Sequence, residues 1–75
     1  MSDAIKTIFH VSGAVQGVGF RPFVYRLARE MGIRGWVRNN PKGVEILAES
    51  DFQTLENFEH ALKTRAPPAA RIAAV

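Results

Sequence analysis

The hydrophobic residues in the first half of the chain follow two different periods. From Ile5 to Gly13 a two-residue alternation places Phe9, Val11 and Gly13 on one face, which predicts a β-strand. After a segment with glycines the spacing becomes three to four residues, which predicts a helix with one buried face. The residues on that face are Phe23, Val24, Leu27, Ala28 and Met31. Pro22 suits the first turn of this helix, and Gly32 suits its end.

The next part of the chain predicts a hairpin followed by a second helix. Residues 33–39 form the second predicted strand, residues 40–43 a turn, and residues 44–49 a third strand that alternates between hydrophobic and other positions. Ser50 followed by Gln53 fits a capping box that opens a helix. The residues predicted to point inward from this helix are Phe52, Leu55, Phe58 and Leu62.

The last part of the chain ends the second helix and begins a fourth strand. Residues 66–68 contain two prolines that stop the helix, and residues 70–75 have the composition of a strand. The predicted order is β-α-β-β-α-β, in one domain that covers residues 1–75. This order is typical of an α+β, ferredoxin-like fold, a split βαβ arrangement in which an antiparallel sheet carries both helices on one face.

The predicted topology brings two distant segments to one edge of the sheet. The first and second strands should be parallel, with the third between them, and the crossover through the first helix should be right-handed. Their C-terminal ends then lie together, where the segment from Val15 to Arg21 leaves the first strand and Asn39 closes the second. The glycine loop, the arginine and the asparagine are therefore predicted to converge.

These residue types suit a phosphate site. Gly17 and Gly19 allow backbone conformations in which successive N–H groups point into one concavity. The helix that follows adds unpaired N–H groups and the positive end of its dipole. Arg21 offers a planar cation for two phosphate oxygens, and Asn39 can hold and orient a water molecule. Asparagine is not a general base, so the water would attack only a phosphate compound that is already activated.

Each of these residues also has a simpler structural explanation. Two glycines between a strand and a helix commonly make only a tight turn, and the segment is not a Walker A loop because no Gly-Lys-Ser/Thr follows. Arg21 alone is a surface charge, and Asn39 next to an Asn-Pro pair is a turn residue. Trp36 is interpreted as packing or surface cover rather than as a platform for a ligand.

Composition narrows the choice of cofactors and partners. Hydrophobic residues make up 47% of the chain and charged residues 23%, as in an ordinary globular protein. With no cysteine, and with His10 and His60 as the two histidines, neither a disulfide nor a metal site is expected. The net charge of +3 favours an anionic partner, whether a small phosphate compound, an acidic protein or nucleic acid. No segment has the pattern of a signal peptide or a membrane span, so a cytoplasmic protein without a membrane partner is expected.

Two motifs resemble those of a known family. Residues 13–21 (GAVQGVGFR) are similar to the acylphosphatase signature, and residues 35–39 (GWVRN), followed by residues 43–46 (GVEI), are similar to its second conserved block. The resemblance implies hydrolysis of an acyl phosphate to a carboxylate and phosphate, without cofactor, metal or covalent intermediate. It also implies that Arg21 binds the phosphate and that Asn39 positions the water. The backbone amides that would complete the phosphate cradle are those of Gln16, Gly17, Val18, Gly19 and Phe20.

Two segments outside these motifs point to one particular group of proteins with an acylphosphatase domain. Residues 21–28 (RPFVYRLA) and 66–72 (APPAARI) resemble the N-terminal domain of the HypF family, the carbamoyltransferases of nickel–iron hydrogenase maturation, more than a stand-alone acylphosphatase. This resemblance implies carbamoyl phosphate as the substrate and carbamate as a product for ATP-dependent adenylation in the remaining domains of the same protein. It further implies transfer of the carbamoyl group to a C-terminal cysteine of HypE, where it becomes an iron-bound cyanide. The family continues after residue 75, so the fourth strand is expected to be truncated.

The sequence is also compatible with two non-catalytic functions. Ferredoxin-like sheets also bind RNA, but the clustered aromatics of the RNP pattern are absent, because the aromatic residues Phe20, Phe23, Phe52 and Phe58 are assigned to the core. No nucleic-acid partner is therefore expected. The other possibility is a docking module that binds phosphate without turning it over.

Overall fold

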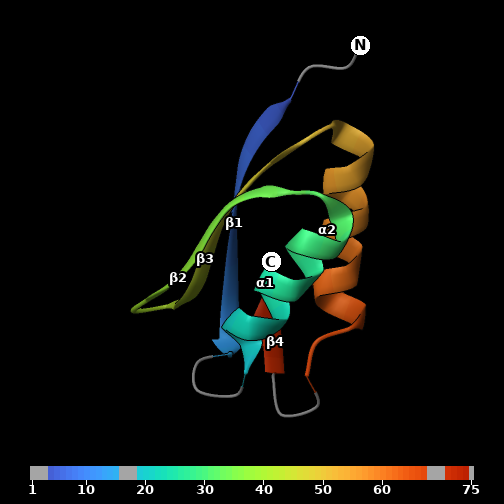
Figure 1. The fold of residues 1–75 in the computed structure, drawn as a ribbon. Coiled ribbons are helices and arrows are strands. Elements are labelled where there is room, and N and C mark those ends of the chain that lie inside the picture. Colours follow the sequence, from blue (N-terminus) through green and yellow to red (C-terminus); the bar gives the residue numbers. More distant parts are fainter. Residues whose placement is uncertain (1–3, 16–18, 68–70, 75) are drawn as a thin grey trace.

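A computed structural model describes residues 4–15, 19–67 and 71–74, and its elements follow the predicted order (Figure 1). The elements are β1 (Ile5–Ala14), α1 (Phe20–Met31), β2 (Arg34–Asn40), β3 (Gly43–Ser50), α2 (Phe52–Thr64) and β4 (Arg71–Ala74). The α+β, ferredoxin-like fold predicted from the sequence is confirmed. Among the described residues, no helix is long and apolar enough to cross a membrane.

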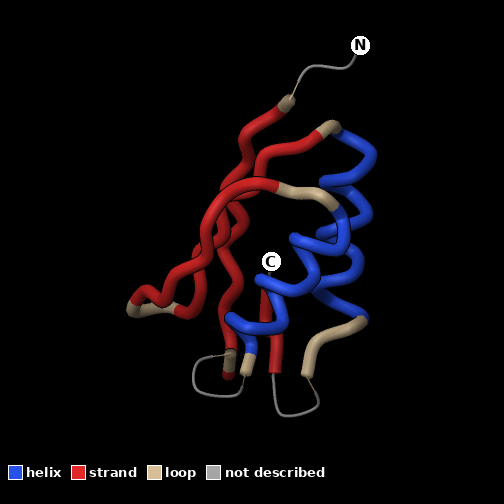
Figure 2. The backbone as a smooth tube through the Cα atoms, viewed as in Figure 1, coloured by secondary structure: helices blue, strands red, loops and turns tan. Residues whose placement is uncertain are grey.

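The sheet has the strand order β2-β3-β1-β4. Both β1 and β2 pair antiparallel with β3, so they run parallel to each other with β3 between them, as predicted. The short strand β4 pairs antiparallel with the end of β1, at Ser12, Gly13 and Ala14. Both helices lie on one face of the sheet (Figures 1 and 2).

The core fills the space between the two helices and the sheet. The pairing of strands explains its composition, because paired residues on neighbouring strands point to the same face. The row formed by Phe9, Ile46 and Val37 faces the helices, and the Phe9 ring meets the Phe58 ring of α2 edge to face at 5.7 Å. The fully buried side chains with the largest volumes are Phe20, Phe58, Leu27, Leu62, Val11, Val15, Val24 and Val44.

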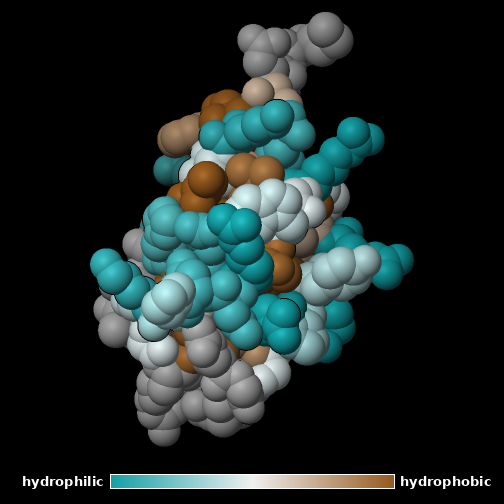
Figure 3. Space-filling view, turned by 90° about the vertical axis from the view of Figure 1, so that its left-hand side faces the viewer, coloured by the Kyte–Doolittle hydropathy of each residue, from teal (hydrophilic) through white to brown (hydrophobic). Residues whose placement is uncertain are grey.

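The opposite face of the sheet carries a mixture of polar and hydrophobic residues. A row across three strands consists of Ile8, Leu47 and Trp36, and Ile8 and Trp36 are exposed. Figure 3 looks at this side of the molecule and shows hydrophobic patches separated by hydrophilic residues. Of the phenylalanine, tyrosine and tryptophan side chains, Trp36 is the one that the described strands place here. RNA-binding sheets of this type stack two or three bases on aromatics, so this face does not favour RNA.

The start of α2 differs from the sequence prediction in two ways. Ser50 is not its N-cap, because Ser50 is the last residue of β3 and pairs there with Ile5. The N-cap is Asp51, whose Oδ1 accepts a hydrogen bond from the Thr54 amide at 2.7 Å. Phe52, predicted to point inward, is 63% exposed, because it is the first residue of the helix and lies outside its buried stripe. That stripe consists of Leu55, Phe58, Ala61 and Leu62.

The hairpin and the end of β1 differ from the prediction by one or two residues. Strand β2 begins at Arg34 rather than at residue 33, and β2 and β3 include Asn40 and Gly43, which leaves a two-residue connection. In β1 the alternation stops early, because the pairing register with β4 shifts between Ser12 and Gly13, and Gly13 is exposed rather than facing the core. The end of α1 is as predicted: Gly32 adopts the left-handed conformation with a φ of 69°.

The cap of α2 gives a prediction about pH. The hydrogen bond from the Thr54 backbone amide lowers the pKa of Asp51 below its ordinary value of 3.8. A carboxylate with a depressed pKa contributes its full stabilisation above its unfolded-state pKa and loses it as the pH falls through the folded-state pKa. We therefore expect Asp51→Ala to lower the urea midpoint at pH 7, and the difference from wild type to shrink below pH 3.8. Urea unfolding at several pH values measures this, with Ser50→Ala as the control. A larger loss in Ser50→Ala than in Asp51→Ala would contradict the assignment of the cap.

Candidate active site

The end of β1 turns sharply before the predicted phosphate loop. Gly13 has a φ of 119°, in a region that favours glycine, and the Val15 amide donates to the Gly13 carbonyl at 3.0 Å. Val15 is then buried, with 1% of its surface exposed, so the side chain of Val15 anchors the chain where it leaves the strand. The next three residues of the predicted cradle, Gln16, Gly17 and Val18, lie outside the described residues.

The chain re-enters the described structure at the first turn of α1. Gly19 is the N-cap in the left-handed conformation, with φ 80° and ψ 13°. No atom lies within 4 Å of where a Cβ would stand, so backbone conformation rather than space requires glycine here. Phe20 follows with 1% exposure and packs against Phe23 at 5.6 Å between ring centroids. The buried ring of Phe20 therefore fixes the start of the helix against the core.

The beginning of α1 is electropositive and uncapped. The first amides of any helix lack an intrahelical acceptor. In α2 the Asp51 side chain supplies one, whereas α1 has no side-chain cap and no acidic residue in its first turn. The Phe23 amide donates to the Gly19 carbonyl at 3.2 Å, and Pro22 has no N–H group to offer. The amides of Gly19, Phe20 and Arg21 are therefore the donors at this helix start that have no intrahelical acceptor. This helix end is therefore suited to binding an anion.

Arg21 adds a full positive charge to this helix end. Its side chain is exposed and forms no ion pair within the described part of the chain. A cation in the first turn opposes the helix dipole and so does not stabilise the helix. Residue types that do not stabilise the local structure are typical of functional positions. The arrangement is suited to an anionic ligand held between the guanidinium and the helix amides.

Asn39 lies on the same side of the sheet as α1. It pairs with Val44, and Val44 pairs with Val11, so the three side chains form one row. Val11 and Val44 are buried beneath the helices, whereas Asn39, on the edge strand, is exposed. Figure 1 shows that the end of β1, the start of α1 and the β2–β3 hairpin lie at the same end of the sheet. The sheet thus presents Asn39 and the start of α1 on one face and at one end.

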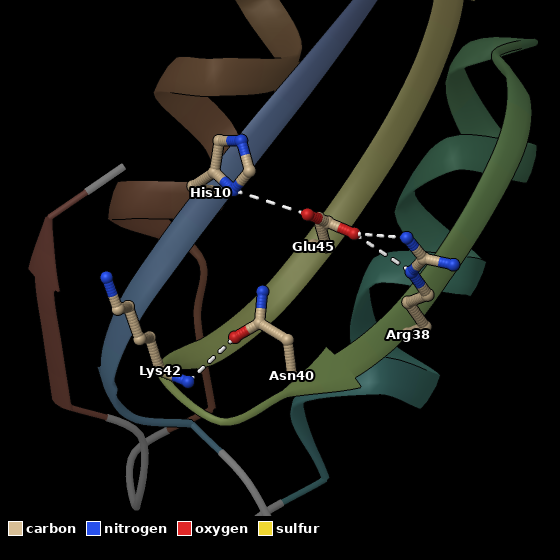
Figure 4. A network of polar contacts seen from close by, with 5 residues as sticks. All are labelled: His10, Arg38, Asn40, Lys42 and Glu45. Atoms are coloured by element: carbon tan, nitrogen blue, oxygen red, sulfur yellow. Dashed lines mark hydrogen bonds and ion pairs between the residues drawn. The ribbon is translucent and has the colours of Figure 1, made fainter.

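The hairpin after Asn39 is held by contacts that sequence reasoning did not identify. The Lys42 amide donates to Asn40 Oδ1 at 2.8 Å (Figure 4). Gly43 pairs with Ser12 of β1 and with Asn40 of β2, and a Cβ on Gly43 would stand 2.1 Å from the Val11 carbonyl oxygen. Gly43 therefore allows a close approach between the strand that leads to the loop and the hairpin next to Asn39. A glycine inside a strand is the sequence signal for such an approach.

A network of polar contacts ties the hairpin strands to β1 on the other face of the sheet. Arg38 binds Glu45 through Nη2 at 2.7 Å and Nε at 2.9 Å, and His10 Nδ1 lies 3.6 Å from the second Glu45 oxygen (Figure 4). The pairing register places these three side chains in one row across β2, β3 and β1. Neighbouring residues along a strand point to opposite faces, so this row braces the sheet next to Asn39 without occupying the candidate site.

Comparison with known proteins decides the family. The family described as acylphosphatase matches residues 7–75, nearly the whole chain. The chain belongs to the acylphosphatase family. As an acylphosphatase domain, it is similar both to parts of large proteins and to small enzymes, and the two groups differ in the share of their length that it covers.

Among the large relatives is the carbamoyltransferase HypF2 of Cupriavidus necator, which is 52% identical over 68 residues. The match covers 91% of this acylphosphatase domain and 8% of that protein. A crystal structure of full-length HypF in a phosphate- and nucleotide-bound form superimposes with a TM-score of 0.91 at 33% identity, over 96% of this chain and 10% of that one. Among the small relatives, the acylphosphatase of Deinococcus radiodurans is 50% identical over 66 residues, which cover 87% of this chain and 75% of that enzyme.

Proposed function

We propose that this acylphosphatase domain hydrolyses acyl phosphates at the end of the sheet where α1 begins, and that its substrate is carbamoyl phosphate. The observation that carries the proposal is the uncapped, arginine-bearing start of α1 on the same face and at the same end of the sheet as Asn39. Membership of the acylphosphatase family supports the reaction class. The roles of Arg21 and Asn39, and of the loop amides from Gln16 to Phe20, are part of the proposal.

In this proposal the protein binds the phosphoryl group and orients a water molecule. The helix and loop amides and the Arg21 guanidinium hold the phosphate oxygens and stabilise charge on them. Asn39 holds a water in line with the bond to the acyl oxygen. The water oxygen forms a bond to phosphorus, the phosphorus–acyl oxygen bond breaks, and its electron pair leaves with the carboxylate. The water protons end on the phosphate or in solvent. A carboxylate leaves readily without a general acid, so positioning and electrostatics suffice.

The choice of carbamoyl phosphate rests on the HypF resemblance. With this substrate the leaving group is carbamate, which we propose is adenylated with ATP in the remaining domains of a HypF-type carbamoyltransferase. The carbamoyl group would then pass to HypE and contribute the cyanide ligand of a nickel–iron hydrogenase. The 52% identity to a carbamoyltransferase HypF2 supports this role. A stand-alone acylphosphatase is the alternative, supported by the 50% identity to the enzyme of Deinococcus radiodurans.

Phosphate release from two acyl phosphates tests this proposal. We expect the chain to release phosphate from both carbamoyl phosphate and benzoyl phosphate, with the larger kcat/KM for carbamoyl phosphate. The alkyl ester glycerol 3-phosphate should be left intact, because its alkoxide leaving group is strongly basic and departs poorly without a general acid. The rate of spontaneous decay is subtracted by parallel reactions without protein. A preference for benzoyl phosphate would favour the stand-alone enzyme, and no release from either acyl phosphate would refute the hydrolase.

A further inference from the structure

A groove lies between α1 and the edge strand β2, away from the candidate active site. It has a volume of about 560 Å³, and neither Arg21 nor Asn39 lines it. Its floor is apolar and includes the buried residues Ile33 and Phe58 and the half-buried Val37. Its rim carries two residues of α1 and two of β2. These are Tyr25, Arg29, Arg34 and Trp36.

The lining of this groove is positively charged. Arg29 and Arg34 line it, and no aspartate or glutamate is among the described residues that do. Two other surface arginines are paired, Arg38 with Glu45 at 2.7 Å and Arg65 with Glu30 at 3.3 Å. Arg29 and Arg34 form no ion pair within the described part of the chain. An occupant with carboxylate groups would supply the missing partners.

The two aromatic residues of the rim favour a protein occupant over a nucleic acid. Tyr25 is 60% exposed and Trp36 40% exposed, and such rings are common anchors of protein interfaces. Arg29 lies over the Tyr25 ring at 5.9 Å, and Arg38 lies over the Trp36 ring at 4.5 Å. One face of the Trp36 ring is therefore already covered and closed to a stacking base. The apolar floor beside it suits a hydrophobic side chain.

The position of β2 in the sheet suits an extended segment. It is an edge strand, and among the described residues its one strand partner is β3. Extended peptides add to such edges through backbone hydrogen bonds while alternate side chains enter neighbouring pockets. Arg34 lies on the face of the sheet away from the helices, whereas Val37 faces them, as Arg29 of α1 does. An added strand would therefore meet Arg34 with one set of side chains, and Arg29 and the floor of the groove with the other.

We propose that this groove docks an extended acidic segment of a partner protein. Carboxylates of the segment bind Arg29 and Arg34, and a hydrophobic side chain fills the floor between Tyr25 and Trp36. The site is independent of the hydrolytic reaction, because it shares neither the cation nor the amide proposed for catalysis. It assigns a docking function to the face of the domain between α1 and β2.

A peptide titration followed by Trp36 fluorescence tests this proposal, since Trp36 is the single tryptophan of the chain. The probe is the peptide acetyl-Glu-Val-Glu-Phe-Glu-Glu-Glu-amide, which carries carboxylates on both faces of an extended strand, and its counterpart with lysine in place of glutamate reverses the charge. The test variant carries Arg29→Glu and Arg34→Glu. The matched control carries Arg26→Glu and Lys42→Glu, which make the same change in net charge at exposed positions outside the groove. Far-UV circular dichroism establishes that each variant is folded.

We expect saturable binding of the acidic peptide that weakens with salt and falls by about tenfold or more in the Arg29 and Arg34 double variant. The control variant should bind within about twofold of wild type, because its charges lie outside the site. Equal binding of the lysine peptide would overturn the proposal, as would equal loss in both variants or no fluorescence change. Binding of a decauridine in place of the peptide, with the same dependence on Arg29 and Arg34, would overturn it in favour of nucleic acid.

Discussion

Arg21→Ala is expected to reduce kcat/KM for acyl phosphate hydrolysis by about a thousandfold. The side chain is exposed and forms no ion pair within the described residues, so its removal leaves no buried group unsatisfied. The substitution should therefore weaken binding of the ligand rather than the fold. The Arg21 guanidinium carries the full positive charge at the start of α1, and that helix start has no side-chain cap and no acidic residue in its first turn. Binding of the ground state and stabilisation of the transition state should weaken together, which raises KM and lowers kcat.

Two further variants separate the role of Arg21 from charge in general. Arg26→Ala removes an exposed arginine from the same helix and should leave kcat/KM nearly unchanged. Arg21→Lys keeps the charge but loses the planar fork, so its activity should lie between those of Arg21→Ala and wild type. Steady-state phosphate release with carbamoyl phosphate measures all three. More than a tenth of wild-type activity in Arg21→Ala would rule out the proposed role.

Asn39→Ala is expected to lower kcat by about a hundredfold with little change in KM. The side chain is exposed beside the row formed by Val11 and Val44, so its loss should not weaken the core. In the proposed reaction its amide orients the attacking water and makes no essential contact with the bound phosphate. An effect on the transition state alone therefore lowers turnover and leaves substrate binding intact.

The control for Asn39 is an asparagine in a different place. Asn57 lies on α2, where Gln53 Nε2 donates to Asn57 Oδ1 at 3.3 Å, and Asn57→Ala should leave both kinetic constants unchanged. Initial rates over a range of benzoyl phosphate concentrations separate kcat from KM. If Asn39→Ala instead raised KM at constant kcat, Asn39 would bind substrate rather than orient water.

The architecture was predictable because its local signals agree with its topology. The change from a two-residue to a helical period marks β1 and α1, and the order of elements with a right-handed crossover places β3 between β1 and β2. Gly19 and Gly32 adopt left-handed conformations at the two ends of α1, as their residue type suggests. The meeting of α1 and Asn39 at one end of the sheet follows from the same rules, without any knowledge of side-chain contacts.

The sequence predictions are wrong where strand pairing between distant residues overrides a local sequence pattern. Ser50 has the right spacing for a capping box, but its backbone is committed to β3 by pairing with Ile5, far away in the sequence. The cap therefore moves to Asp51, and Phe52 falls at the first helical position with its ring outside the core. The close approach of Gly43 to Val11 is also a contact between distant residues. No local window of sequence contains it.

The proposed roles of Arg21 and Asn39 place both side chains around one phosphorus atom, although they lie 18 positions apart in the sequence. Inorganic phosphate carries the oxygen that the water supplies, so the product should occupy the position of the water beside Asn39. Titration of the ¹⁵N-labelled chain with inorganic phosphate, followed by ¹H–¹⁵N correlation spectra, measures this directly. We predict that the backbone amides of Gly19, Phe20 and Arg21 and the side-chain amide of Asn39 shift together with one dissociation constant. The side chain of Asn57 should not move. Shifts in the α1 amides that leave the Asn39 side chain unaffected, or that saturate at a different phosphate concentration, would contradict a single site.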